Sequence, residues 1–334
     1  MAKIIKKYYT LYKTATDTND YFWIKNEGSS STGYLNVGTS GDWDEPLECS
    51  FDKINWWSYK DTYSHQWAAG EKIYFRNSSG VFSSSSSKFA KFYQNEGNSI
   101  SIGGDMTTLL DYTLSNTGDI KTLPDYCFYK LFNSSNLLSV DCNIGGVETI
   151  GGSSFYSSFM ASTALTSVVF DMSNVKTIKG SGVRQMFQNC SNATSIDIDL
   201  SSLETVETYG MYNMFQYCSN ATSIDIDLSS LETVGNNGMY GMFSGCYYIT
   251  EGVDLKSVTT VGNNGMFQLY YNCYALSEAT APNVDTWNRT NFSSWLSGAG
   301  INVPGTKTVN CPTGVTIPTD DNSGIPSDWT RVDY

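Results

Sequence analysis

Two stretches of 20 residues in this chain are almost identical. Residues 187–206 read FQNCSNATSIDIDLSSLETV and residues 215–234 read FQYCSNATSIDIDLSSLETV, an offset of 28 residues. A period of roughly 20–50 residues is typical of a solenoid, in which each unit buries its apolar face against the next. Because solenoids present extended surfaces, the repeat indicates a binding or structural protein more than an enzyme.

The same period extends beyond the identical pair, over about five units between residues 131 and 276. Aromatic residues and cysteines recur at equivalent positions of these units. We predict that they form the structural core of the repeats: Phe159, Phe187, Phe215, Phe243 and Tyr270, with Cys190, Cys218, Cys246 and Cys273. A free cysteine packs as a small hydrophobe, and the chain has no Cys-x-x-Cys pair or Cys/His cluster of the kind that binds metal.

Each unit combines a strand with turns. Residues 195–200 alternate apolar and polar side chains, which predicts a strand with one buried face, and residues 203–206 form a second short apolar stretch. Met211, Met214 and Phe215 have the spacing of one or two helical turns. This order predicts a leucine-rich-repeat-like coil with short helical turns.

The unit resembles the BspA-like leucine-rich repeats, which carry an aromatic-x-x-Cys core followed by an apolar strand. The motif Met-Phe-x-x-Cys occurs at residues 186–190, 214–218 and 242–246, and this longer form is similar to repeats of gut bacteria and their phages. The resemblance covers residues 121–300. It implies a fold and, because folds host many functions, says less about activity.

The remaining segments give the predicted domain organisation. Short alternating runs within residues 20–110 predict an Ig-like β-sandwich, and part of this region resembles the β-domain that precedes such repeats. The fold class is therefore mainly β, with this sandwich followed by a solenoid of period 28 over residues 111–300. Residues 1–19 form a basic attachment segment, and residues 301–334 form a C-terminal cap or a second attachment segment.

No run of apolar residues resembles a secretory signal or a membrane span. If Met1 is the natural start, we expect no export by the usual route and no membrane insertion. The formal net charge of −13 argues against a nucleic-acid partner, which would need basic patches. With His65 as the sole histidine and no phosphate-binding loop, we predict no catalytic residues and no enzyme activity.

Acidic residues recur on the outward face of the predicted strand. Stacked coils would align four of them about 4.8 Å apart in one column: Asp171, Asp199, Asp227 and Asp254. Such a ladder could recruit Ca²⁺ through its carboxylate oxygens. The alternative, which we favour, is a solvated acidic face that needs no cofactor and whose charges are screened by salt.

Aromatic residues supply the ligand-binding candidates. Trp56, Trp57 and Trp67 lie in the β-rich N-terminal part, while Tyr212 and Tyr240 share one position of the repeat. Rings along a groove could hold sugar faces. A ring beside an apolar Met at helical spacing is equally well explained as core.

Together these features predict a non-enzymatic virion surface protein, a head or tail fibre or decoration, of a phage that infects gut bacteria. Its partners would be other virion proteins and a glycan or protein of the host surface or mucus. Virion proteins assemble inside the cell and need no export signal. The rivals are a bacterial cell-surface BspA-like adhesin, a capsid decoration without a ligand and, last, a depolymerising enzyme. A homo-oligomer would form through the β-domain or the solenoid ends.

Overall fold

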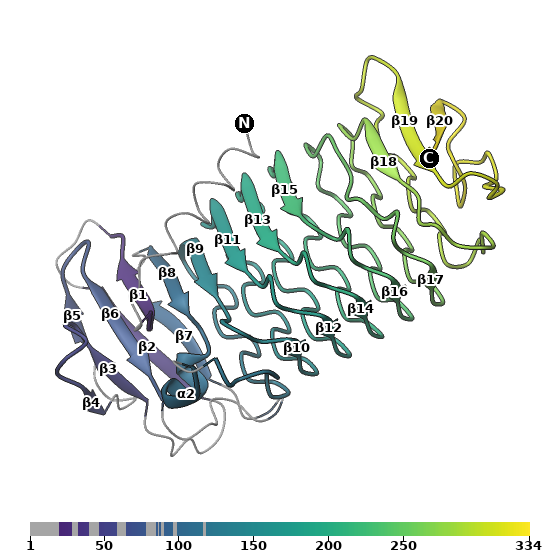
Figure 1. Cartoon of the computed structure of the whole chain (residues 1–334). Helices are drawn as coiled ribbons and strands as arrows, with labels where there is room; N and C mark the ends of the chain where they lie inside the picture. Colours follow the sequence, from purple (N-terminus) through teal and green to yellow (C-terminus); the bar gives the residue numbers. More distant parts are fainter. Residues whose placement is uncertain are drawn as a thin grey trace.

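A computed structural model describes residues 20–28, 33–39, 47–58, 65–77, 85, 87, 90–95, 99–115 and 118–334. The molecule is elongated, and its N-terminal strands continue into a stack of coils that ends in a small C-terminal sheet (Figure 1). The described part has one helix, α2 (Thr108–Ser115). None of its helical segments has the length and apolar character needed to cross a membrane.

The described strands form four sheets. The large sheet has the order β15 (Ser223–Ile226), β13 (Ser195–Asp199), β11 (Ser167–Asp171), β9 (Leu137–Asn143), β8 (Ile100–Asp105), β1 (Phe22–Asn26), β6 (Lys72–Arg76), β3 (Glu48–Ser50) and β4 (Trp57–Ser58). The second has the order β10 (Thr149–Ile150), β12 (Thr177–Ile178), β14 (Thr205–Val206), β16 (Thr233–Val234) and β17 (Thr260–Val261). Two three-stranded sheets comprise β5 (His65–Trp67), β2 (Gly33–Thr39) and β7 (Ala90–Asn95), and β18 (Glu278–Thr280), β19 (Lys307–Cys311) and β20 (Trp329–Asp333).

The repeat strands pair in parallel at the predicted period. Ile196 of β13 lies beside Ile224 of β15, and Ser195 lies beside Ser223, each 28 residues along the chain. Side chains alternate across the strand, so Ile196 and Ile198 are buried while the residues between them face outward. The predicted mainly β solenoid with a leucine-rich-repeat-like coil is confirmed.

The predicted helical turns are not formed at residues 207–218. This segment is a run of consecutive reverse turns, in which the N–H of Gly210 donates to Glu207 O (2.9 Å) and that of Met214 to Met211 O (3.2 Å). We call this segment and its equivalents in the other coils the turn ladder. The prediction was wrong because buried residues at i, i+3 and i+4 fit a helix and this series of turns equally well.

Backbone hydrogen bonds of the turn ladder alternate between two directions. One set of N–H groups closes turns within its own coil, and the N–H groups between them donate to the next coil. For example, Met211 N donates to Gly238 O and Asn213 N donates to Tyr240 O, both at 2.8 Å. Every second residue therefore binds the neighbouring coil, as in a sheet. Buried backbone groups need such partners, since an unpaired one is costly in free energy.

This geometry places residues in the left-handed region at regular intervals of four. Tyr209, Asn213 and Tyr217 have φ of 59°, 53° and 60°. Type II turns require a positive φ at their third residue, which usually favours glycine. Gly241 and Gly245 occupy two of these positions in the following coil, with φ of 57° and 76°. Side chains in the other coils tolerate the conformation because hydrogen bonds on both sides fix it.

The core inside the coils is a stack of aromatic rings bordered by cysteines. Phe187 and Phe215 are fully buried, and their ring centroids lie 6.1 Å apart with nearly parallel planes. The stack runs through Phe132, Phe159, Phe187, Phe215, Phe243 and Tyr270. Beside it, each repeat cysteine donates its S–H to a phenylalanine carbonyl of the preceding coil, at 3.1–3.2 Å: Cys190, Cys218, Cys246 and Cys273.

The N-terminal strands extend the solenoid on both of its sides. β8 pairs in parallel with β9, so the large sheet crosses the predicted boundary at residue 110 without a break. On the opposite side, Phe92 N of β7 donates to Leu131 O of the first turn ladder, at 2.8 Å. The Phe92 ring stacks on that of Phe132 at 5.3 Å. The Ig-like topology stays a prediction, and residues 1–19 lie outside the described residues.

One unit replaces its strand by a side-chain hydrogen bond. No described strand covers residues 251–255, and there the N–H of Val253 donates to the hydroxyl of the fully buried Tyr270, at 2.9 Å. Gly252 leaves room for this hydroxyl, because a Cβ there would lie 2.8 Å from it. Tyr270 thus supplies the acceptor that a neighbouring strand supplies in the other units.

We expect Tyr270→Phe to lower the free energy of unfolding by about 1–3 kcal/mol, because the buried Val253 N–H loses its partner. Denaturant unfolding followed by circular dichroism measures this change. Tyr240→Phe removes a hydroxyl from a partly exposed ring and is the matched control. Equal stability of the two variants would contradict the role of Tyr270.

All eight cysteines are free and buried, and burial raises the pKa of Cys190 to about 12. The reactive thiolate is therefore scarce at pH 8. We expect the native protein to react negligibly with a chromogenic disulfide reagent at that pH and to release eight equivalents of thiol once unfolded. Rapid labelling of several thiols without denaturant would show that the coils open.

Candidate binding site on the solenoid

A row of side chains runs along the surface of the turn ladder, one from each coil. It comprises Tyr129, Tyr156, Arg184, Tyr212, Tyr240 and Phe267, which we call the outer row. The ring centroids of Tyr212 and Tyr240 lie 4.7 Å apart, and those of Tyr240 and Phe267 lie 4.6 Å apart, with nearly parallel planes. The guanidinium of Arg184 lies 4.5 Å from the Tyr212 ring centroid and takes the place of a ring.

The turn ladder fixes the spacing of this row. Carbonyl oxygens of the row members accept hydrogen bonds from the preceding coil, for example Tyr212 O from Gln185 N at 2.9 Å. Successive rings are therefore separated by one coil. Partial burial raises the pKa of the Tyr240 hydroxyl, and the neighbouring Tyr212 contributes to the shift.

The stacking limits what the row can bind. Neighbouring rings cover the faces of Tyr240, so a sugar cannot lie flat on it. The side chains of the row from Tyr156 to Phe267 are half-buried. The row therefore offers regularly spaced groups that can donate or accept hydrogen bonds, beside apolar edges.

At its C-terminal end the outer row opens into a pocket of about 350 Å³. It is lined by Asn264, Phe267, Arg289, Thr290, Ser293, Asn322 and Ser323. Phe267 is the last ring of the row. Pockets with a few convergent polar groups and an apolar surface are typical ligand sites.

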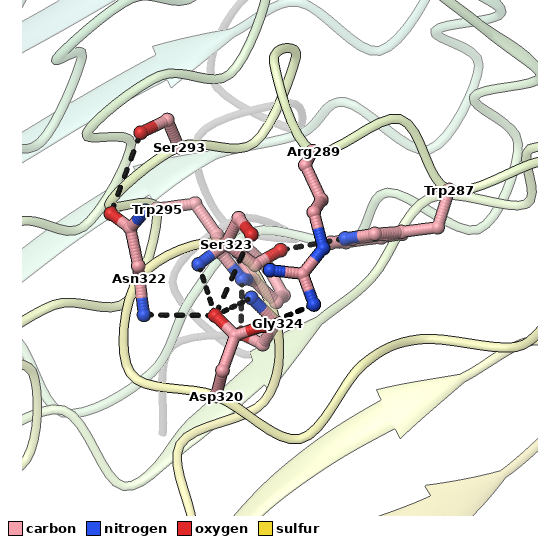
Figure 2. A network of polar contacts seen from close by, with 8 residues as sticks. All are labelled: Trp287, Arg289, Ser293, Trp295, Asp320, Asn322, Ser323 and Gly324. Carbon is pink, nitrogen blue, oxygen red and sulfur yellow. Dashed lines mark hydrogen bonds and ion pairs between the residues drawn. The ribbon is translucent and has the colours of Figure 1, made fainter.

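A tightly bonded loop forms one wall of this pocket, and Figure 2 shows its contacts. One carboxylate oxygen of Asp320 accepts the N–H groups of Asn322, Ser323 and Gly324 at 3.0, 2.7 and 3.2 Å. These amides, above all that of Ser323, and the Arg289 guanidinium at 3.0 Å hold the pKa of Asp320 below its usual value. Asp320 thus fixes both the loop and the arginine.

Two buried tryptophans anchor the same loop from below. The indole N–H of Trp287 donates to Ser323 O at 2.6 Å, and that of Trp295 donates to Gly324 O at 2.7 Å (Figure 2). Hydrogen bonds with Asp320, Trp287 and Trp295 thus hold residues 322–324. The pocket wall is preorganised as a result.

The predicted ligand-binding aromatics do not gather in one place. Trp56 is half-buried, with the Arg76 guanidinium 4.0 Å from its ring centroid and Tyr21 at its edge. Trp57, in β4, packs partly against the core. Trp67 belongs to β5 in another sheet, and its side chain lies outside the described parts. Tyr212 and Tyr240 lie together in the outer row.

The acidic column is explained by local turns. Asp171 lies beside Asp199 in the register of β11 and β13. Each member accepts a hydrogen bond at 3.0–3.1 Å from the backbone N–H two residues further on: Asp171, Asp199, Asp227 and Asp254. Among the described residues, no group of three or more His, Cys, Asp or Glu side chains is arranged to hold a metal ion. Each aspartate begins a turn, and in the units that have a strand this turn follows the strand.

The sequence interpretation did not identify the end pocket. Phe267 could have been found, because it continues the Tyr212 and Tyr240 column at a step of 27 residues. Arg289, Ser293 and Asn322 carry no comparable signal, since the repeat pattern fades after residue 276.

We expect Asp199→Ala to lower stability by about 1 kcal/mol, because the Ser201 N–H loses its acceptor, and Asp199→Asn to leave stability unchanged or raised. Thermal unfolding measures both. Asp225→Ala removes a charge from the neighbouring column and is the control. EDTA should leave the melting temperature unchanged at matched ionic strength. A lower melting temperature in EDTA would support Ca²⁺ binding by the aspartate column.

Comparison with known proteins agrees with the coil geometry. The model of the BspA type leucine rich repeat region matches residues 89–181 and 121–297, with six copies. No curated protein sequence matches the chain.

Two solved structures show limited similarity. A leucine rich repeat protein of T. pallidum is 18% identical with a TM-score of 0.31, over 65% of this chain and 79% of that one. A leucine rich cell surface protein of Faecalibacterium prausnitzii A2-165 is 16% identical with a TM-score of 0.18, over 64% and 83%. The family model spans more than half of the sequence, and the chain belongs to the BspA-type leucine-rich-repeat family.

Proposed function

We propose that this protein is a non-enzymatic adhesion protein that binds glycans of a host surface or of mucus. The observation that carries the proposal is the outer row, in which each coil from Tyr156 to Phe267 presents one partly exposed aromatic or arginine side chain. A row of this length is suited to a ligand that is itself repetitive.

The chemistry of the row favours a polyhydroxylated chain. Phenol hydroxyls at coil spacing can exchange hydrogen bonds with sugar hydroxyls, and ring edges supply apolar contact. The net charge of −13 disfavours strongly anionic ligands such as nucleic acids. Individual contacts of this kind are weak, so useful adhesion would come from many sites acting together.

The place of display is the second part of the proposal. The Met-Phe-x-x-Cys form of the repeat resembles units of gut bacteria and their phages, and this supports a position on the surface of a phage particle, as a fibre or decoration joined to other virion proteins. Display on many copies of a particle would supply the multivalency that weak sites need.

Binding is tested with purified protein attached to beads at high density and exposed to mucin and to the neutral polysaccharide dextran. We expect retention on at least one of these glycans. We expect the double variant Tyr212→Ala and Tyr240→Ala to reduce it several-fold, because both hydroxyls and ring edges are lost. Retention that survives removal of the glycan by glycosidases, or no retention at all, would overturn glycan binding and favour a ligand-free decoration.

Location is tested by peptide mass spectrometry of density-purified phage particles beside the envelope fraction of the host. Peptides from residues 20–110 and from the repeats should both occur in the particles at a countable copy number. Peptides confined to the envelope would identify a bacterial cell-surface adhesin instead.

A further inference from the structure

The outer row is interrupted at one position just before the chain ends. The carbonyls of its members accept hydrogen bonds from the preceding coil, and this pattern continues from Phe267 to Ser293, whose carbonyl accepts from Gln268 N at 2.9 Å. It continues again to Asn322, whose carbonyl accepts from Ser294 N. Ser293 therefore occupies the position of the next ring, and its side chain is far smaller than a ring.

The missing ring leaves a space of defined size. Phe267 and Asn322 stand two coils apart, which corresponds to roughly 9.6 Å at about 4.8 Å per coil. Both residues line the pocket of about 350 Å³ described above. Tyr240 stacks on one side of Phe267, and the short Ser293 occupies the next position on the other side. The position left empty beside Phe267 has the thickness of one ring, and the Asn322 amide oxygen is held near it by the hydroxyls of Ser293 (3.5 Å) and Ser294 (3.2 Å).

The residues that line the pocket favour a sugar ring over an aromatic ring as the ligand. Beside the one aromatic ring, that of Phe267, the lining residues include Thr290, Asn322 and Arg289, which carry hydroxyl, amide and guanidinium groups. An aromatic ligand would displace water from these polar groups without offering them hydrogen bonds of its own, which costs free energy. A pyranose can place its C–H groups on Phe267 and its hydroxyls on the polar groups.

The charge of the site indicates a neutral sugar instead of an acidic one. The Arg289 guanidinium is paired with Asp320 at 3.0 Å, so its charge is already neutralised in part. The whole chain carries a net charge of −13, which repels acidic sugars. A neutral sugar needs no free positive charge for binding and is not repelled by the net negative charge.

We propose that the space between Phe267 and Asn322 binds one neutral pyranose ring of a glycan, as the most selective subsite of the adhesion surface. This inference rests on the proposed function and assigns its strongest contact. The hydrogen bonds of Asp320, Trp287 and Trp295 hold the Asn322 wall in place before the sugar arrives. Little ordering is therefore needed on binding.

The test titrates the purified full chain with methyl glycosides of glucose, galactose, mannose and N-acetylglucosamine, followed by ligand-observed NMR. We expect saturable binding of at least one of them. Phe267→Ala should weaken it roughly tenfold, as expected for a lost stacking surface. Tyr248→Ala, which removes an exposed ring outside the outer row and outside the pocket lining, is the matched control and should leave the affinity unchanged.

A second variant tests the space itself. Ser293→Phe would supply the missing ring, so it should abolish binding of the methyl glycosides while the melting temperature stays the same or rises. This outcome separates loss of the site from loss of the fold. Undiminished binding by Ser293→Phe, or equal weakening by Phe267→Ala and Tyr248→Ala, would overturn the proposed subsite.

The bead assay distinguishes failure of the subsite from failure of the proposed function. If Ser293→Phe is retained on mucin or dextran like the unchanged protein, adhesion stands and this subsite is wrong. If the unchanged protein is retained on neither glycan and binds none of the methyl glycosides, both fail.

Discussion

Hydrogen bonding between successive coils is the interaction on which the rest of this structure depends. On one side of the coil it takes the form of parallel strands, as between β11 and β13. On the other side, every second amide of the turn ladder donates to the next coil. Both patterns impose the same separation between coils. Side chains that occur once per coil are therefore spaced at the same separation. This holds for the aromatic core, the cysteine column and the outer row.

The repeat sequence predicted those parts of the fold that recur with the backbone period. The strand at residues 195–199, the buried Phe187 and its neighbouring Cys190 follow from alternation and spacing. The turn ladder does not, because the left-handed conformation of Tyr209 and Tyr217 has no sequence signal of the kind glycine would give. Hydrogen bonds to the next coil impose it, because the N–H groups of Tyr209 and Tyr217 donate to carbonyls that lie 27 residues further along the chain.

The candidate site shows the same division between recurring and unique features. Tyr212 and Tyr240 were recognised because their positions repeat. The aspartate column was also recognised, but its turn-forming role depends on the local Asp-x-Ser spacing more than on stacking between coils. The end pocket depends on residues beyond the regular units. The role of Ser293 could not be predicted, because only the backbone hydrogen bonds show that it occupies the row position after Phe267.

The direction of the inter-coil hydrogen bonds also determines how the molecule carries mechanical load. These bonds run along the long axis of the solenoid, from each coil to the next. Since each coil contacts only its neighbours, a pull on the two ends strains the coil boundaries in series. The weakest boundary opens first, and each coil that unfolds adds about 28 residues of unfolded chain between the two ends. The two ends would then stay joined by an extended stretch of chain, with the remaining coils still folded.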